Sequence, residues 1–125
     1  MSLNVLILDD SSEHGSEVWW HMSCIIIDIT KTIPTVVKKI GEADLALTKN
    51  DFTNIIIHHY DFTKIDALRS KFPDIKYAGY SANIDYDYQI EYNTGHKFFE
   101  EMRKHYDYLI SSDNFKEDII SIFKP

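Results

Sequence analysis

The sequence predicts an α/β domain of three layers, in which helices cover both faces of a central five-stranded parallel sheet. The first observation is that short aliphatic runs alternate with longer segments of helical period, which is typical of a parallel sheet buried on both faces. The second is that the 125 residues are 44% hydrophobic and 26% charged, close to globular averages. Neither an internal repeat nor a low-complexity linker divides the chain. We therefore expect residues 1–125 to form a single domain.

The expected strands are short apolar segments that end in polar residues. Segment 4–8 is almost continuously apolar, and segment 53–57 ends in three isoleucines, as expected of central strands buried on both faces. Segments 75–80 and 106–110 are each followed by small polar residues. Together with a second strand at 35–40, they complete the five strands.

Helices are expected between the strands because apolar residues recur there at a period of 3.6. A helix at 63–72 has this spacing and stops at Pro73. Further helices at 94–104 and 114–123 each present one apolar stripe that can pack on the sheet.

The region from Ser11 to Asp51 allows two interpretations. In the preferred one, a long helix contains Cys24 and is followed by the strand at 35–40 and a helix at 42–50. In the other, a strand begins at Cys24, and a helix from about residue 33 carries Pro34 in its first turn, where proline is favoured. Cys24 is the only cysteine, so no internal disulfide can form, and we expect it to be buried as a small apolar residue.

The charge of the chain limits its partners. The net charge is −7 and the pI is about 5.2, so the chain repels the phosphate backbone of nucleic acids and anionic lipid surfaces. No apolar run approaches the about 18 residues that a membrane helix requires. We therefore expect a cytoplasmic protein that binds neither nucleic acid nor membrane. The sequence contains no GxSxG, P-loop or GxGxxG motif, so we do not expect an enzyme.

Polar residues gather where the expected strands end. Because ligands of open parallel sheets bind at the carboxyl ends of the strands, these residues define the candidate site. They are Asp9, Asp10, His58, His59, Ser81 and Ser111.

The order of these segments resembles the receiver domain of two-component response regulators over nearly the whole chain. The matching segments are Val5–Asp10, Gly41–Leu47, Asn54–His59, Ile65–Ile75 and Tyr77–Ala82. The resemblance implies a flavodoxin-like, receiver-like three-layer αβα sandwich. It also implies that Asp9 and Asp10 hold Mg²⁺, which prefers oxygen ligands, and that Ser81 and Tyr108 form the conformational switch.

Two residues that receivers need for phosphorylation are missing at the matching positions. His59 takes the place of the phosphoryl-accepting aspartate, and histidine cannot form the acyl phosphate on which receivers depend. Ser111 and Ser112 replace the Lys-Pro pair, so the cation that neutralises the phosphoryl group is absent. We therefore interpret the chain as a pseudo-receiver, a signalling or protein-interaction module without conventional aspartyl phosphorylation.

Two other interpretations stay open. Shifting the register by two residues makes Asp61 the acceptor of an active phosphorelay receiver with Mg²⁺, but places His58 and His59 inside a buried strand. Alternatively, Asp9, Asp10 and His59, or His58 in its place, form a metal site or a metalloenzyme. Only one of His58 and His59 could join, since adjacent strand residues point to opposite faces.

The expected partners are proteins of a signalling pathway. The resemblance implies a partner face with Phe99, Tyr106 and Tyr108. Beside it lies an acidic, tyrosine-rich insertion at 84–92, which we interpret as an added contact surface. A homodimer also stays open. One of the neighbours Trp19 and Trp20 should be exposed, because consecutive helical residues diverge.

Overall fold

The computed structural model describes residues 3–9, 15–58, 61–81, 102–111 and 114–123, with the side chains of 15–19 and 81 left out. The strands are β1 (Val5–Asp9), β2 (Thr35–Val37), β3 (Asn54–His58), β4 (Lys76–Ser81) and β5 (Tyr108–Ser111). The helices are α1 (Gly15–Thr30), α2 (Ile40–Lys49), α3 (Phe62–Lys71) and α6 (Phe115–Phe123), and residues 102–105 are also helical. The expected helix at 94–104 otherwise lies outside the described residues.

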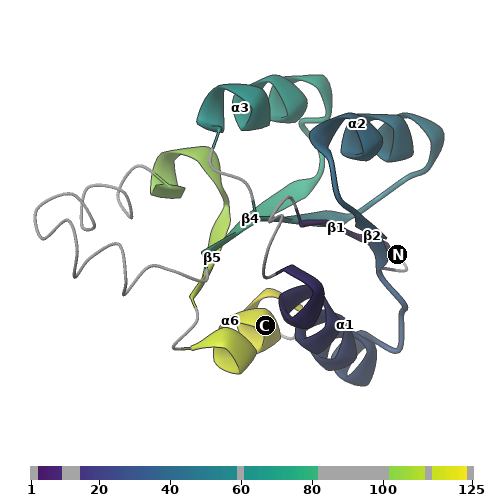
Figure 1. The fold of residues 1–125 in the computed structure, drawn as a ribbon, viewed down its shortest axis with the longest axis vertical. Helices are drawn as coiled ribbons and strands as arrows, with labels where there is room; N and C mark the ends of the chain where they lie inside the picture. The colour runs from purple at the N-terminus through teal and green to yellow at the C-terminus, as the bar shows by residue number, and fades with distance from the viewer. Residues whose placement is uncertain (1–2, 10–14, 59–60, 82–101, 112–113, 124–125) are drawn as a thin grey trace, which may run out of the picture.

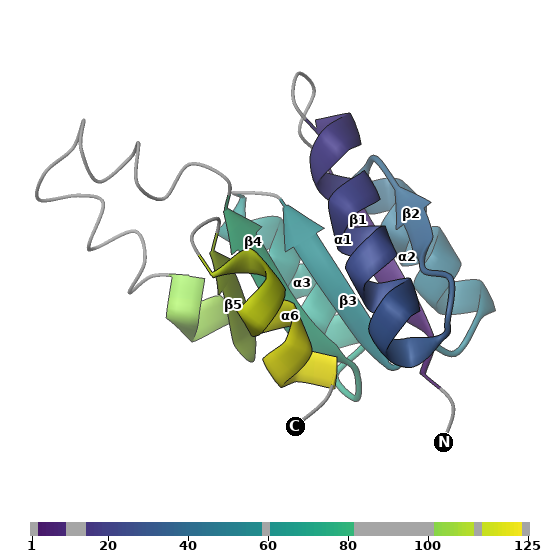
Figure 2. The same cartoon turned by 90° about the horizontal axis from the view of Figure 1, so that it is seen from below.

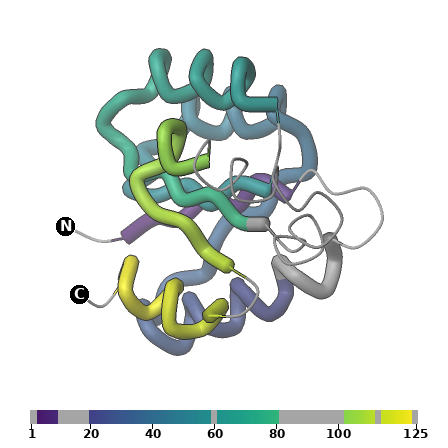
Figure 3. The backbone as a smooth tube through the Cα atoms, turned by 90° about the vertical axis from the view of Figure 1, so that its left-hand side faces the viewer, coloured from purple at the N-terminus to yellow at the C-terminus, as the bar shows by residue number. Residues whose placement is uncertain are grey.

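The five strands form one parallel sheet in the order β2-β1-β3-β4-β5. Figure 1 shows α2 and α3 on one side of this sheet and α1 and α6 on the other. The tube in Figure 3 shows the same two helical layers with the strands between them. The predicted three-layer αβα sandwich is therefore confirmed. Among the described helices, none is long and apolar enough to cross a membrane.

The two interpretations of the region before β3 are now distinguished. The long helix α1 is confirmed, and the alternative with a helix from about residue 33 is wrong. Lys31 ends α1, because it adopts a left-handed φ of 59° while its N–H donates to the Ile27 carbonyl at 2.8 Å. Pro34 lies in the connection to β2. β2 is shorter than the predicted strand at 35–40, because α2 already begins at Ile40.

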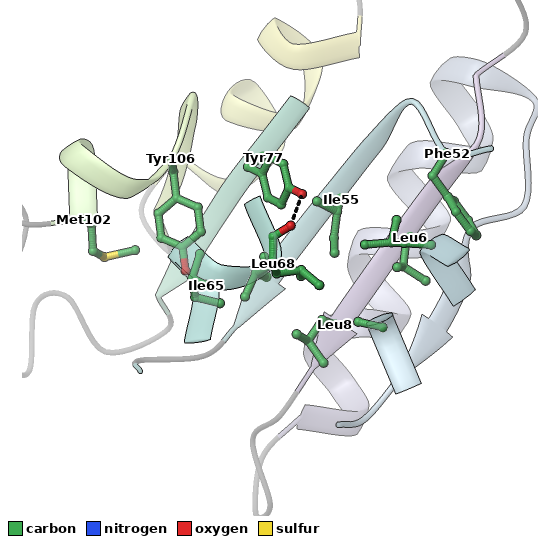
Figure 4. Packing of buried hydrophobic residues seen from close by; sticks show 12 residues of the cluster. Leu6, Leu8, Phe52, Ile55, Ile65, Leu68, Tyr77, Met102 and Tyr106 are labelled. Atoms are coloured by element: carbon green, nitrogen blue, oxygen red, sulfur yellow. Dashed lines mark hydrogen bonds between the residues drawn. The ribbon is translucent and has the colours of Figure 1, made fainter. Parts of the chain in front are cut away.

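Apolar side chains on both faces of the sheet explain why its central strands read as continuous apolar runs. Successive strand residues alternate between the faces. In β1, Leu6 and Leu8 pack with residues of α2 and α3, whereas Val5 and Ile7 pack with residues of α1 and α6. Figure 4 shows the first of these clusters.

Cys24 is exposed, so the prediction that it is buried is wrong. α1 packs on the sheet through Met22 and Ile26, which are one turn apart and 2% and 0% exposed. Cys24 lies midway between them in sequence and therefore on the opposite side of the helix. Trp20 is also exposed, as expected of one of the paired tryptophans, and the side chain of Trp19 lies outside the described part.

Tyr106 is a buried residue just before β5 rather than part of the strand. β5 begins at Tyr108, two residues later than predicted, and Tyr106 is only 6% exposed. The ring of Tyr106 packs against Gly79 of β4, within the cluster that contains Met102. Tyr106 is therefore mainly a core residue rather than the exposed residue of a partner face that was predicted, and only its edge lines the surface beside Tyr108.

An ion-pair network ties this segment to α3. The two terminal nitrogens of Arg69 donate to the His105 carbonyl and to Asp107 Oδ1, each at 2.6 Å. The second oxygen of Asp107 accepts the Tyr77 backbone N–H at 2.9 Å. His105 Nδ1 lies 2.6 Å from Asp66 Oδ1. These contacts fix where β5 enters the sheet.

Candidate functional site

The candidate site lies where the parallel strands end. Figure 2 shows the arrowheads of β2, β3 and β4 at the same edge of the sheet. Asp9 is the last residue of β1 and pairs in register with His58, the last residue of β3. The sheet therefore brings together an acid and a histidine that are far apart in the sequence.

The carboxylate of Asp9 is buried and meets two nitrogen groups. Asp9 is only 2% exposed. Asp9 Oδ2 lies 3.3 Å from Lys38 Nζ, which donates to it, and Asp9 Oδ1 lies 3.4 Å from His58 Nδ1. The contact with His58 is an ion pair only when the imidazole is protonated. A buried carboxylate needs such partners, because burial disfavours an uncompensated charge.

On the side away from Asp9, His58 contacts an aromatic residue of the next strand. Its ring meets Tyr80 of β4 edge to face, with centroids 5.3 Å apart. Tyr80 in turn meets Phe115 of α6 in the same way at 5.6 Å. The His58 side chain is 10% exposed. A chain of ring contacts thus connects His58, at the polar edge of the sheet, with Phe115 of α6.

Lys38 was not identified from the sequence. The predicted strand at 35–40 placed it inside a strand, whereas it directly follows β2. Its position is the signal that could have found it, since the end of β2 lies beside the end of β1 in a parallel sheet. Leu8 and Val37 are register partners, so Asp9 and Lys38 are the next residues of their chains.

Several predicted site residues lie outside the described part. Asp10 and His59 belong to this group, as do Ser112, Phe99 and the tyrosine-rich segment at 84–92. The backbone of Ser81 is described and pairs with Ser111 at the end of β4, but its side chain is not. The predicted switch residue Tyr108 begins β5 and is 39% exposed.

Ser111, at the position of the lost lysine, holds the start of α6. Its backbone N–H donates to Asp118 Oδ2 at 2.9 Å, and its hydroxyl lies 3.3 Å from the same oxygen. The hydroxyl also accepts the Asn114 N–H at 3.2 Å. The side chain at the end of β5 therefore takes part in a turn that leads into the helix.

Asp61, the alternative acceptor, is the N-cap residue of α3. Its carboxylate accepts the Lys64 N–H at 3.4 Å, and its side chain is 45% exposed. Asp61 lies three residues beyond the end of β3. Side-chain capping satisfies a backbone donor that the first helical turn leaves without an intrahelical acceptor.

Of the two residues predicted to hold Mg²⁺, the structure describes only Asp9. No group of three or more His, Cys, Asp or Glu residues that could hold a metal occurs within the described ranges. The described neighbours of Asp9 include an ammonium and an imidazole, whereas Mg²⁺ requires oxygen ligands in a near-octahedral arrangement.

Comparison with known proteins identifies the fold. No protein family and no curated protein matches the sequence. An uncharacterised protein from Neptuniibacter caesariensis aligns with a TM-score of 0.68 and 14% identity, over 96% of this chain and 83% of that one.

Two further structures carry functional names. One is named adenylate cyclase, from Rhodopirellula baltica, with a TM-score of 0.60 and 15% identity over 99% of this chain and 89% of that one. The other is a Francisella response-regulator receiver domain, with a TM-score of 0.57 and 17% identity over 98% of both chains. At these identities the likeness is one of fold alone, and this chain has the flavodoxin-like fold of response-regulator receiver domains.

Proposed function

We propose that the chain is a pseudo-receiver, a signalling module that binds a protein partner and is not phosphorylated on an aspartate. The end of β3 at His58 carries this proposal. The acceptor aspartate of receivers directly follows the third strand, and the residue in that place here is His59. A histidine there cannot supply the carboxylate oxygen that an acyl phosphate requires.

The remaining parts of the phosphorylation machinery support the same proposal. The position of the family's lysine holds Ser111, whose hydroxyl is engaged at the start of α6. Without a fixed cation at this place, the site lacks one of the groups that stabilise a transferred phosphoryl group. Asp61 already caps α3, and using it as acceptor would require giving up that hydrogen bond.

Phosphorylation is tested directly with acetyl phosphate and Mg²⁺, and intact-protein mass spectrometry reads the result. An authentic receiver treated in parallel is the positive control. We expect no gain of a phosphoryl mass. A gain in the wild type that disappears in Asp61→Asn would establish the active phosphorelay alternative instead and overturn the proposal.

The partner surface is proposed on the side of β5. Tyr108 is an exposed aromatic residue. A shallow hollow of about 350 Å³ beside it is lined by Arg103, Asp107 and Leu109 as well as by the two tyrosines 106 and 108. Aromatic residues and arginine are enriched in protein interfaces, where they act as anchors.

This surface is tested by comparing Tyr108→Ala with Leu45→Ala in pull-downs from the source cells. Leu45 is a matched control, because it is 55% exposed on α2, away from β5. Loss of the same partner with Tyr108→Ala alone supports the surface. Tyr86, Tyr88 and Tyr92 form the second alanine set. If every partner stays bound in all these variants, the proposed surface is wrong.

A further inference from the structure

We propose that Lys38 is the internal counter-charge of Asp9 and replaces the divalent cation that the receiver fold implies. The proposal deepens the proposed function, because it concerns the regulation of the same acidic position. It predicts a site that is complete without Mg²⁺.

The first step of the argument is the burial of Asp9. Asp9 is only 2% exposed, and its carboxylate lies beside the ammonium of Lys38. Removing a carboxylate from water is unfavourable unless opposite charge and hydrogen bonds compensate it. The Lys38 ammonium, whose Nζ lies 3.3 Å from Asp9 Oδ2, supplies that compensation.

The second step is that Lys38 and a divalent cation compete for the same oxygen. Mg²⁺ binds carboxylate oxygens at about 2.0–2.1 Å and keeps a near-octahedral shell of oxygens around itself. An ammonium at 3.3 Å from Oδ2 occupies the space and the charge that this shell requires. The Lys38 ammonium therefore disfavours Mg²⁺ binding at Asp9, since two cations at such short range repel each other.

The third step is the origin of the cation. In receivers the lysine follows the fifth strand, where this chain has Ser111. Lys38 instead follows β2, and β2 and β5 are the opposite edge strands of the sheet. The lysine beside Asp9 therefore comes from the edge of the sheet opposite to the one that carries the lysine of receivers. There the lysine pairs with the carboxylate itself.

The experiment measures thermal unfolding with millimolar Mg²⁺ and with a chelator, for the wild type and Lys38→Met. Lys49→Met is the matched control, because it removes the same charge from an exposed position at the end of α2. We expect a wild type and a control whose Tm values do not depend on Mg²⁺. We expect Lys38→Met to lose about 3–8 °C in the chelator and to recover part of that loss with Mg²⁺.

A Mg²⁺ response of equal size in the wild type and in Lys38→Met overturns the proposal, as does a response in neither. If Lys38→Met does not fold, the double variant Asp9→Asn/Lys38→Met removes both charges. It should fold and show no Mg²⁺ response, and its failure to fold would also count against the pairing. The proposed function is tested by the mass change in the acetyl phosphate assay, and the role of Lys38 is tested by Tm. A failure of one can therefore be distinguished from a failure of the other.

Discussion

A β-carbon placed on Gly79 would lie 2.5 Å from two carbons of the Tyr106 ring. Gly79 is a central residue of β4, and Tyr106 is a buried residue just before β5. Glycine is required here because the ring lies where any other side chain would begin. The tyrosine and the strand therefore determine each other's position.

Gly79→Ala should destabilise the protein by about 1–3 kcal/mol, because the buried ring cannot move away without disturbing the core. Urea denaturation measures the change. Gly41→Ala is the control, since a β-carbon on Gly41 in α2 would meet nothing within 4 Å. That change should stabilise the helix by about 0.5–1 kcal/mol. Equal effects of the two substitutions would contradict the close approach of Tyr106.

Asp107 is predicted to contribute more to stability than an exposed acid in an ion pair of similar length. It accepts both the Arg69 guanidinium at 2.6 Å and the Tyr77 backbone N–H at 2.9 Å. Asp107→Ala leaves these donors without this acceptor, and should cost about 1.5–3 kcal/mol.

The comparison is Asp44→Ala, which removes an exposed pair with Lys71 at 2.7 Å. Exposed pairs contribute about 0–1 kcal/mol, so this control should change little. Chemical denaturation of both variants under identical salt conditions gives the two values. A larger loss in Asp44→Ala than in Asp107→Ala would refute the role of the network.

The stability of the protein should fall at high pH because of Tyr77. Burial raises the pKa of Tyr77 from 10.0 to about 12, although the nearby Arg69 lowers it. The Tyr77 hydroxyl donates to the Phe72 carbonyl at 2.7 Å and lies 3.3 Å from the Leu68 carbonyl. Figure 4 shows the second of these contacts. A phenolate carries no proton to donate, so its formation would remove both contacts as hydrogen bonds.

The unfolded chain releases this proton near pH 10 and the folded chain only near pH 12. The contribution of protonated Tyr77 is thus fully present below pH 10 and is lost as the pH rises toward 12. Tyr77→Phe should be less stable than the wild type by about 1 kcal/mol at neutral pH. The difference should shrink across this window, as followed by urea unfolding at several pH values. A constant difference would show that Tyr77 does not titrate as proposed.

Asp118 should stabilise the junction between β5 and α6. It accepts the Ser111 backbone N–H at 2.9 Å and approaches the Ser111 hydroxyl at 3.3 Å. Asp118→Ala should therefore cost about 1–2 kcal/mol. Glu117→Ala removes a neighbouring exposed acid from the same first turn and serves as the control. Thermal unfolding should separate the two variants, and identical Tm values would argue against a stabilising contact between Asp118 and Ser111.

The sequence by itself determined the fold class and the order of the elements. Central strands buried on both faces must be apolar throughout, so β1 and β3 appear in the sequence as aliphatic runs. The helical period and Pro73 likewise located α3 to within about one residue, close to the usual scatter of helix ends. The preference for a long α1 was also confirmed, since its apolar stripe has helical spacing.

Only the tertiary structure decided which residues meet at the candidate site. Asp9, Lys38 and His58 come from three segments, and parallel pairing of β1 with both β2 and β3 places them together. Local sequence carries no record of such pairing, because the hydrogen bonds of a sheet join residues that are distant along the chain. The burial of Tyr106 was mispredicted for the same reason, since it depends on the packing of its ring against Gly79. The exposure of Cys24 instead follows from the helical period of α1, because Met22 and Ile26 face the sheet.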